Sequence, residues 1–554
     1  MPWSIGRLVA ARPYALLVGL CLLLYLPGIV AIPPLDRDEA RFAQATRQML
    51  ETGDFLRIRF QDEARNRKPA GIYWLQAIAV GAFSTPASTA MWPYRLPSLA
   101  GATASVLLTF AFGAVLLGGD SEHRRIAMVA AVLLASALGL VAEAHIAKTD
   151  AALLAAITAA QGALGLAYVR ARSARPVAAW IAVLFWSAEI VAVYLKGPPG
   201  PALAIVTAAT LSIADREVGW LRGLRPVAGV AALVIAVAPW LIAIERVTEG
   251  RFLADSLGRD LLAKVVGEQE SHGAPPLSYL LFALVTFWPG SLLLAQAGIG
   301  AWRRRRALAE RFLIAWLVPG WVVLELVPTK LPHYVLPLYP ALAMLTAAAL
   351  VDGAGLPAAR WAGRLDLAVR VLWAVVSLAL AALLVGLPLH FGGHIAAAGV
   401  IGAVLLLALA AALLYRRPGP QGTAALIAGL SLAFAVPAGA FVLPGVDRVW
   451  LSREAAGLVA RHPPAAGAPL VAVGYSEPSL VFLLGTDLHL TAPSSAAGVL
   501  AAGGEALVSA REGASFARAL SARGLHARPL GSVSGIDYSN GKSMVLTLYT
   551  VTPG

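Results

Sequence analysis

Ionisable side chains gather in a few short segments of an otherwise apolar chain, where carboxylates stand close to cations. Asp38 lies in the first segment, Lys68 follows it, and Lys148-Thr149-Asp150 begins a later apolar run. A carboxylate among cations suits a reaction on an anionic lipid. The cations would hold a phosphate leaving group, and the carboxylate would act as a base or stabilise charge at the reacting carbon. We therefore predict Asp38 and Asp150 as catalytic residues and Lys68 as a phosphate ligand.

Each of these residues also has a structural interpretation. Asp38 and Asp150 stand where an Asp can cap a helix, and Lys68 could extend its long side chain to the lipid–water boundary. Tyr334 is either a phosphate ligand or part of an aromatic belt. The other residues predicted to contact substrate are Glu39, Arg41, Lys148, Lys196 and Lys330.

One loop between apolar runs offers candidate ligands for a divalent cation. Its Glu268, Glu270 and His272 follow the spacing E-x-E-x-H, which is a weak signal for a metal site. We name His272 as the candidate ligand. The single cysteine, Cys21, lies within an apolar run, so the sequence has no disulfide framework and no cysteine-based metal site.

The composition places these segments in a membrane protein. Hydrophobic residues make up 58% of the 554 residues, charged residues make up 14%, and the mean hydropathy is +0.73. A soluble globular chain of this length is not built in this way. The net charge of +13 comes from Arg clusters in short loops between apolar runs. That is the positive-inside pattern, and it needs no nucleic acid partner.

About 20 apolar residues are needed to cross the bilayer. By this measure the sequence predicts an α-helical polytopic membrane protein with about 13 transmembrane helices. The predicted spans are 13–32, 93–118, 124–142, 151–169, 176–195, 199–214, 226–244, 277–300, 311–327, 332–351, 367–389, 395–415 and 423–444.

The loops between these spans alternate in charge. The Arg-rich loops are predicted to be cytoplasmic, which places the loops bearing the candidate site on the outer side. The first outer loop, 33–92, is predicted to contain an amphipathic helix with Gln44 and Arg47 on one face and Phe42 and Met49 on the other. Such a helix suits a membrane surface. A second short helix is expected after Lys68-Pro69.

The chain after residue 444 changes character. Short β-like runs at 470–473 and 543–550 alternate with helix-like stretches at 452–461 and 514–523. We therefore predict a transmembrane domain over 1–444 and a small soluble α/β domain over 445–554, on the outer side.

Six motifs occur in an order that resembles the aminoarabinose transferase family, which is related to the protein O-mannosyltransferases. They are DRDEARFAQATRQMLETGDF, RKPAGIYWLQA, KTD, KGPPGP, ESHGAPPLSYLL and TKLPHYVLPLYP. The resemblance covers nearly the whole chain. It implies a C-type glycosyltransferase fold in a bacterial inner membrane, acting on the periplasmic side. The implied donor is a polyprenyl-phosphate-linked sugar, and the implied acceptor is lipid A or another periplasmic acceptor.

The resemblance also implies roles for single residues. The family's two functional Asp residues match Asp38 and Asp150, and its phosphate ligands match Lys68 and Tyr334. A basic residue of the long outer loop matches Lys264, where the aminoarabinose enzymes have arginine; Arg259 is the competing position. In those enzymes a Glu before the lysine helps to bind a metal, but here that residue is Arg67.

Four functions remain open from the sequence alone. The first is transfer of a sugar to lipid A or lipopolysaccharide, and the second is transfer to protein on the same scaffold. The third is a flippase or transporter for lipid-linked sugar, which would carry inverted repeats and ionisable groups at mid-depth in the membrane. The fourth is a non-catalytic assembly subunit that uses the soluble tail for binding.

Overall fold

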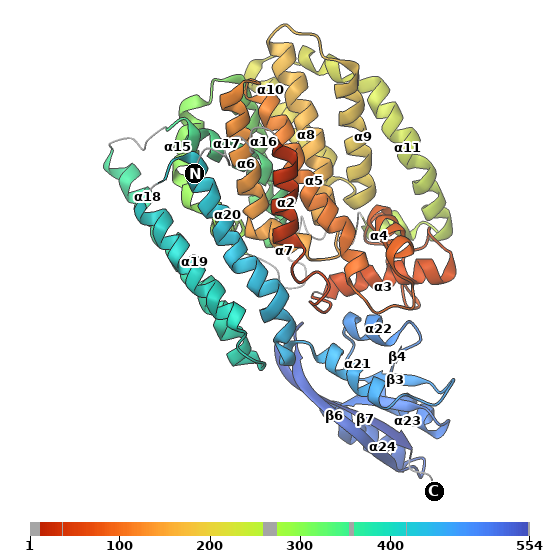
Figure 1. The fold of residues 1–554 in the computed structure, drawn as a ribbon. Helices are drawn as coiled ribbons and strands as arrows, with labels where there is room; N and C mark the ends of the chain where they lie inside the picture. Colours follow the sequence, from red (N-terminus) through yellow and green to blue (C-terminus); the bar gives the residue numbers. More distant parts are fainter. Residues whose placement is uncertain are drawn as a thin grey trace.

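The computed structural model describes residues 12–35, 37–256, 258, 274–353, 359–416 and 418–551. A large helical part is followed by a smaller part that contains a sheet (Figure 1). The helices of the first part are α2 (Pro13–Tyr25), α3 (Arg37–Thr52), α4 (Gly71–Phe83), α5 (Trp92–Leu116), α6 (Ser121–Ser136), α7 (Leu138–Ala144), α8 (Asp150–Arg172), α9 (Ala179–Lys196), α10 (Pro199–Asp215), α11 (Pro226–Val247), α12 (Arg251–Leu253), α14 (Ser278–Thr286), α15 (Leu294–Arg304), α16 (Leu308–Leu326), α17 (Tyr339–Val351), α18 (Arg360–Phe391), α19 (Ala397–Arg416) and α20 (Pro420–Pro437).

Helix α8 lies inside the helical part because its small residues let its neighbours approach closely. A Cβ atom on Gly162 would lie 2.3 Å from the ring of Phe112, and one on Gly165 would lie 2.7 Å from the ring of Phe312. Small residues permit such close packing between membrane helices. Of an apolar 18-residue stretch of α8, 89% is buried inside the protein, whereas only 11% of the corresponding stretch of α11 is buried. Helix α11 therefore turns most of its apolar surface outward, as a lipid-facing helix does.

Eight helices are long and apolar enough to cross a membrane, or nine if α6 and α7, which meet at 60°, form one bent span. This count covers only the part of the chain that the structure describes. Each predicted span overlaps a helix, and the predicted region 277–300 is divided among α14, a 3-10 turn and α15. The chain is thus a multi-pass membrane protein, and the count of 13 spans stays a prediction.

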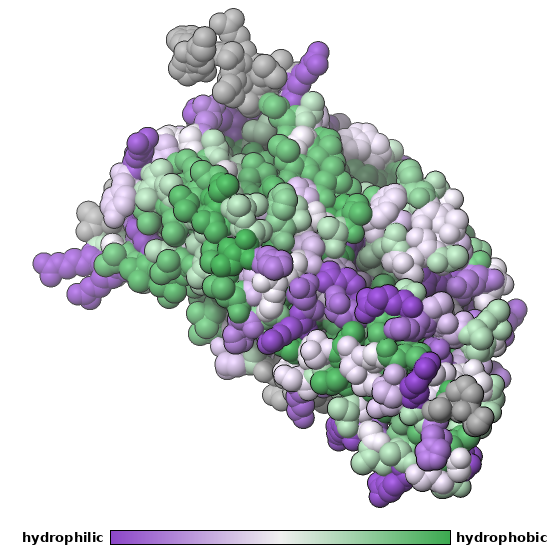
Figure 2. Space-filling view, turned by 60° about the horizontal axis from the view of Figure 1, so that its bottom comes forward, coloured by the Kyte–Doolittle hydropathy of each residue, from purple (hydrophilic) through white to green (hydrophobic). Residues whose placement is uncertain are grey.

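The Arg-rich loops meet at the end of the helical part away from the sheet (Figure 1). Arg172 pairs with Asp215 at 3.6 Å and with Glu217 at 2.8 Å, and Arg304 pairs with Glu310 at 2.7 Å. These ion pairs join the ends of α8, α10, α15 and α16. Figure 2 shows apolar side chains over the helical part and a band of hydrophilic ones where the sheet-containing part begins.

The C-terminal part is a mixed five-stranded sheet with helices, in the strand order β4-β3-β5-β7-β6. Strands β4, β3 and β5 are parallel, and β7 and β6 form an antiparallel hairpin at the edge. The two predicted β runs and two predicted helices are confirmed to within three residues. The elements are α21 (Leu451–Arg461), β3 (Leu470–Val473), α22 (Pro478–Leu484), β4 (His489–Leu490), α23 (Pro493–Ala501), β5 (Glu505–Ser509), α24 (Gly513–Ser521), β6 (Ala527–Asp537) and β7 (Lys542–Val551).

Helix α3 forms as predicted, but protein covers both of its faces. The apolar residues Phe42 and Met49 pack in a cluster with Tyr73 and Leu153. On the polar face, the buried Arg47 donates to the backbone oxygen of Phe482 in α22 at 2.5 Å. Both faces of α3 are therefore occupied by protein, and its position at the membrane surface stays a prediction. An amphipathic pattern does not distinguish a lipid surface from a second protein surface.

Candidate active site

The carboxylate of Asp38 lies in the first turn of α3 and is 53% exposed. One of its oxygens is 3.4 Å from a guanidinium nitrogen of Arg41, one turn along the same helix, and 3.4 Å from one of Arg65. Arg65 also donates to the hydroxyl of Tyr73 at 3.3 Å. The half-exposed carboxylate is therefore held between two cations while it remains accessible.

These cations set the charge of Asp38. Partial burial would raise the pKa of this carboxyl, but Arg65, Arg41 and Lys148 outweigh that effect and hold its pKa below the usual value. Nearby positive charges favour the ionised form. Asp38 is therefore an anion at neutral pH, suited to orienting a cationic or hydroxyl group or to stabilising positive charge on a reacting carbon.

A second cluster joins the beginning of α8 to the end of α9. Lys196 Nζ lies 2.5 Å from Oδ1 of Asp150, and His333 Nε2 lies 3.9 Å from Oδ2. His333 Nδ1 and Lys148 Nζ each lie 3.7 Å from Oε1 of Glu143. This cluster brings together charged residues from three separate segments of the chain, 143–150, 196 and 333.

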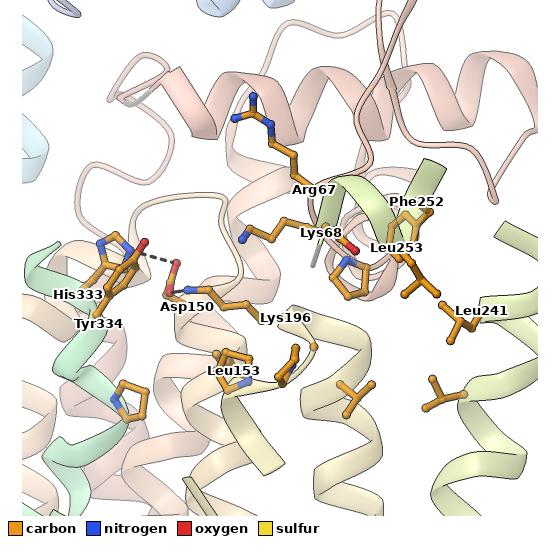
Figure 3. A pocket seen from close by; sticks show the side chains of 18 of the residues that line it. Arg67, Lys68, Asp150, Leu153, Lys196, Leu241, Phe252, Leu253, His333 and Tyr334 are labelled. Atoms are coloured by element: carbon orange, nitrogen blue, oxygen red, sulfur yellow. Dashed lines mark hydrogen bonds and ion pairs between the residues drawn. The ribbon is translucent and has the colours of Figure 1, made fainter. Parts of the chain in front are cut away.

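A cavity of about 440 Å³ opens beside this cluster. Lys68, Lys196, Asp150, His333 and Tyr334 line one end of it. Figure 3 shows Lys68 and Lys196 extending toward the same end, whereas Arg67 extends away from them. Lys196 Nζ lies 5.3 Å from the centre of the Tyr334 ring. This end of the cavity is suited to an anionic group.

The other end of the cavity is apolar. It is lined by side chains from α11, α12 and α16 and the turns beside them, namely Val237, Trp240, Leu241, Phe252, Leu253, Leu324 and Val327. An anion attached to a long hydrocarbon chain would match both ends at once. A separate apolar groove of about 660 Å³ lies between α4, α5, α8 and α9 and is lined by residues such as Leu75, Ala155 and Leu195.

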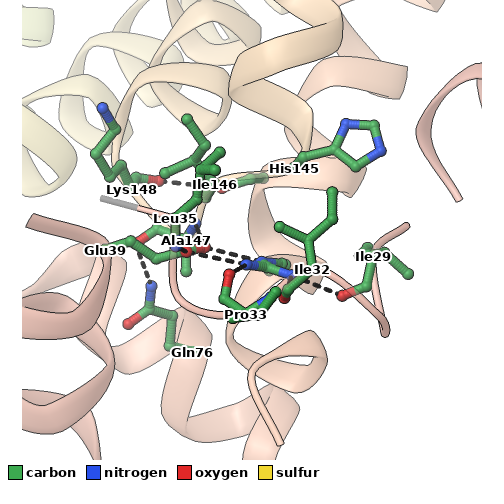
Figure 4. A network of polar contacts seen from close by, with 12 residues as sticks. Ile29, Ile32, Pro33, Leu35, Glu39, Gln76, His145, Ile146, Ala147 and Lys148 are labelled. Carbon is green, nitrogen blue, oxygen red and sulfur yellow. Dashed lines mark hydrogen bonds and ion pairs between the residues drawn. The ribbon is translucent and has the colours of Figure 1, made fainter. Parts of the chain in front are cut away.

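Two residues predicted to contact substrate have structural partners instead. Glu39 is fully buried, and its carboxylate receives bonds from Arg95 at 2.8 and 2.9 Å and from the backbone N–H groups of Leu35 and Ala147 (Figure 4). Lys330 is buried and donates to the backbone oxygens of Val327 and Ala274 at 2.9 and 3.1 Å. These bonds occupy both charges within the fold, so the structure argues against the two predicted substrate contacts.

The pair of Glu39 and Arg95 predicts a large effect on stability. Changing Arg95 to Leu would leave a buried carboxylate without its cation, which typically costs about 3–5 kcal/mol. We expect a clearly lower thermal unfolding temperature in detergent. As a control, changing Arg251 to Gln removes an exposed pair with Glu249 (3.4 Å) and should alter stability by about 0.5 kcal/mol or less. Equal effects from the two changes would contradict this role.

The candidate metal site at Glu268, Glu270 and His272 lies outside the described residues and stays a prediction. Arg67, at the position where the resemblance implies a metal-binding Glu, is a cation and cannot act as a ligand. Within the described ranges, no group of three or more His, Cys, Asp or Glu side chains could hold a metal ion. His272, Lys264 and Arg259 lie outside the described residues, so their predicted roles stay predictions.

Sequence reasoning missed several residues of the site. The sequence indicated no role for Arg65, Glu143 or His333. The signal for Arg65 was its place between the Asp38 helix and Lys68. The apolar wall with Trp240 and Phe252 gave no separate signal, because such residues are common in any membrane helix.

The chain is similar to known proteins over part of its sequence and over most of its fold. No family model matches the chain. It is similar to undecaprenyl phosphate-α-4-amino-4-deoxy-L-arabinose arabinosyl transferases. The one from Pectobacterium carotovorum is 27% identical over 312 residues, 56% of this chain and 54% of that protein. The one from Pseudomonas aeruginosa is 28% identical over 338 residues, 60% and 59% of the two chains. The chain spans little more than half the length of the curated relatives that it matches.

The likeness to solved structures extends over almost the whole chain. The structure of ArnT from Cupriavidus metallidurans bound to undecaprenyl phosphate matches with a TM-score of 0.73 and 19% identity, covering 97% of this chain and 98% of that one. The archaeal oligosaccharyltransferase AglB from Archaeoglobus fulgidus, in complex with an inhibitory peptide and a dolichol-phosphate, gives 0.50 and 12% with coverage of 100% and 75%. The predicted C-type glycosyltransferase fold is confirmed.

Proposed function

We propose that this chain is a membrane glycosyltransferase of the aminoarabinose transferase type. It moves a sugar from a polyprenyl-phosphate donor to a lipid A-type acceptor on the periplasmic face of a bacterial inner membrane. The observation that carries this proposal is the two-ended cavity, with Lys68, Lys196 and Tyr334 at one end and the Trp240–Phe252 wall at the other. The Arg-rich loops at the opposite end of the helical part support a periplasmic site.

In the proposed reaction, the bond between the anomeric carbon and a phosphate oxygen breaks, and an acceptor oxygen forms a bond to that carbon. The departing phosphate gains one negative charge, which Lys68 and Tyr334 would stabilise in a partly dewatered cavity. Lys264 or Arg259 would add a further cation. Lys196 is paired with Asp150. This pair would therefore orient the donor phosphate at the polar end of the cavity while adding little net charge there.

Asp38 would act on the acceptor side. If the acceptor group is a hydroxyl, Asp38 would orient it or accept its proton. If the acceptor group is a phosphate, it is already anionic and needs little base catalysis, and Asp38 would stabilise positive charge developing on the sugar. The groove between α4, α5, α8 and α9 would accommodate an acyl chain, which favours a lipid acceptor over a protein.

The experiment that tests the proposal measures glycosyl transfer by the purified full-length protein in detergent. The donors are a set of polyprenyl-phosphate sugars, and the acceptors are lipid A and a periplasmic protein in separate reactions. We expect transfer to lipid A with at least one donor. Transfer to the protein and not to lipid A would show that the acceptor is a protein, not a lipid. Absence of transfer, together with movement of lipid-linked sugar across proteoliposomes, would support a flippase instead.

The charge of Asp38 predicts a specific pH dependence. Changing Arg65 to Gln removes the cation that most lowers the pKa of Asp38, so that pKa should rise. The ionised form would then be lost at a higher pH, and the acid limb of the rate profile for transfer should shift upward. The control is Arg57→Gln, which removes an exposed partner of Asp54 and should leave the limb in place. An unshifted limb in the Arg65 variant would contradict the assignment.

A further inference from the structure

We propose that the C-terminal domain takes part in donor binding, by holding the hairpin that directly precedes the site's cations. Gln61 is the positioning residue that makes the connection. The hairpin consists of β1 (Arg59–Phe60) and β2 (Glu63–Ala64). Its turn is hydrogen-bonded to α3 on one side and to the loop before β4 on the other. This inference rests on the proposed function. It assigns a role to the C-terminal domain, which contributes no residue to the proposed reaction.

Gln61 lies at the turn of the hairpin and is held from the side of α3. The side chain of Gln48 accepts from the backbone N–H of Gln61 at 2.8 Å and donates to its backbone oxygen at 3.0 Å. Both polar backbone groups of Gln61 are therefore satisfied by one amide of α3. The turn cannot move away from α3 without losing both bonds.

The side chain of Gln61 reaches the C-terminal domain. Its amide nitrogen donates to the backbone oxygen of Thr486 at 3.3 Å and to that of Leu488. The Thr486 hydroxyl in turn accepts from Gln44 at 2.8 Å and donates to Glu51 at 2.8 Å, both on α3. One loop of the C-terminal domain thus contacts the hairpin and α3 together.

The hairpin leads directly to the candidate site. Its second strand ends at Ala64, and the next residue, Arg65, pairs with Asp38. Arg67 and Lys68 follow and line the donor cavity. Phe60, just before the turn, packs against the core of the C-terminal domain. The distance along the chain from the gripped turn to Lys68 is only seven residues, so the orientation of the turn limits where Lys68 can lie.

The backbone conformation of Gln61 distinguishes a positioning role from a purely stabilising one. Its φ of +53° is left-handed, a conformation that costs energy for any residue except glycine. A glycine would fit this backbone better, so the choice of residue does not serve local stability. What Gln61 adds is the amide that reaches Thr486 and Leu488, and strained residues of this kind often mark functional contacts.

The test is the Gln61→Gly variant of the full-length protein, with donor kinetics and thermal unfolding measured together. We expect the unfolding temperature to stay equal or rise, while kcat/KM falls by about tenfold or more through a higher KM for the donor. Binding of the sugar-free polyprenyl phosphate, followed by the fluorescence of Trp240 and its neighbours, should weaken in parallel. Thr486→Ser, which keeps the hydroxyl and the backbone, should retain wild-type kinetics.

A matched control is Ala174→Gly. Ala174 has a φ of +54° in an Arg-rich loop at the other end of the helical part, so this change relieves similar strain far from the site and should leave kinetics unaltered. Unchanged donor kinetics in Gln61→Gly would overturn the inference. So would a lowered unfolding temperature, since Gln61 would then be a plain stability contact. If the unaltered protein transfers no sugar and binds no polyprenyl phosphate, the proposed function fails instead.

Discussion

Changing Asp38 to Asn is expected to lower the rate of glycosyl transfer by at least about 100-fold, the scale of a lost general base or charge-stabilising carboxylate. Asparagine preserves the size of the side chain and removes only the charge that Arg65, Arg41 and Lys148 maintain. Because the donor phosphate would bind in the cavity beside Lys68 and Lys196, donor affinity should change little. The measurement is single-turnover transfer to lipid A, alongside binding of polyprenyl phosphate.

The control for this variant is Asp54→Asn, a carboxylate of the same outer loop that pairs with Arg57 and caps backbone N–H groups. It should keep nearly full activity. A normal rate in the Asp38 variant would remove Asp38 from the chemistry. The stereochemistry adds an independent check. Direct displacement inverts the anomeric centre, so a retained configuration or a sugar attached to Asp38 would contradict the proposed step.

The sequence predicted the grouping of the site well because membrane physics limits where charges can lie. Asp38, Lys148, Asp150 and Lys196 come from three separate loops, yet all must avoid the hydrocarbon. Alternation of the Arg-rich loops places them at one end of the protein. The structure brings Asp150 and Lys196 into direct contact. The sequence could predict that both residues lie at the same end of the protein, but not that they form an ion pair.

The sequence could not separate functional charges from structural ones. Glu39 follows Asp38 directly and looks equally suited to substrate, but a helix turns neighbouring residues in different directions. Glu39 therefore points inward to Arg95, while Asp38 points to the open side. The same limit applies to α3, whose polar face required a partner that lies over 400 residues away in the chain. Long-range packing of this kind leaves no local pattern.

Changing Lys68 to Met is the second large expected effect. Lys68 lines the polar end of the cavity, and Met keeps a long side chain while removing the charge. Losing one fixed group that stabilises transition-state charge typically costs about 2.7–4 kcal/mol, or a factor of about 10²–10³ in rate. Because the sugar phosphodiester already carries a charge, the donor KM should rise as well. Transfer kinetics at varied donor concentration measure both effects.

The split between these two parameters decides what Lys68 does. The phosphate is a monoanion in the bound donor and gains a second charge as it leaves, so a cation beside it should act more strongly on the leaving group than on the donor. A larger loss in kcat than in donor affinity would therefore place Lys68 at the departing oxygen. A loss of donor affinity with an unchanged kcat would make Lys68 a binding residue only. The matched control is Lys542→Met on strand β7, an exposed lysine, which should change neither parameter.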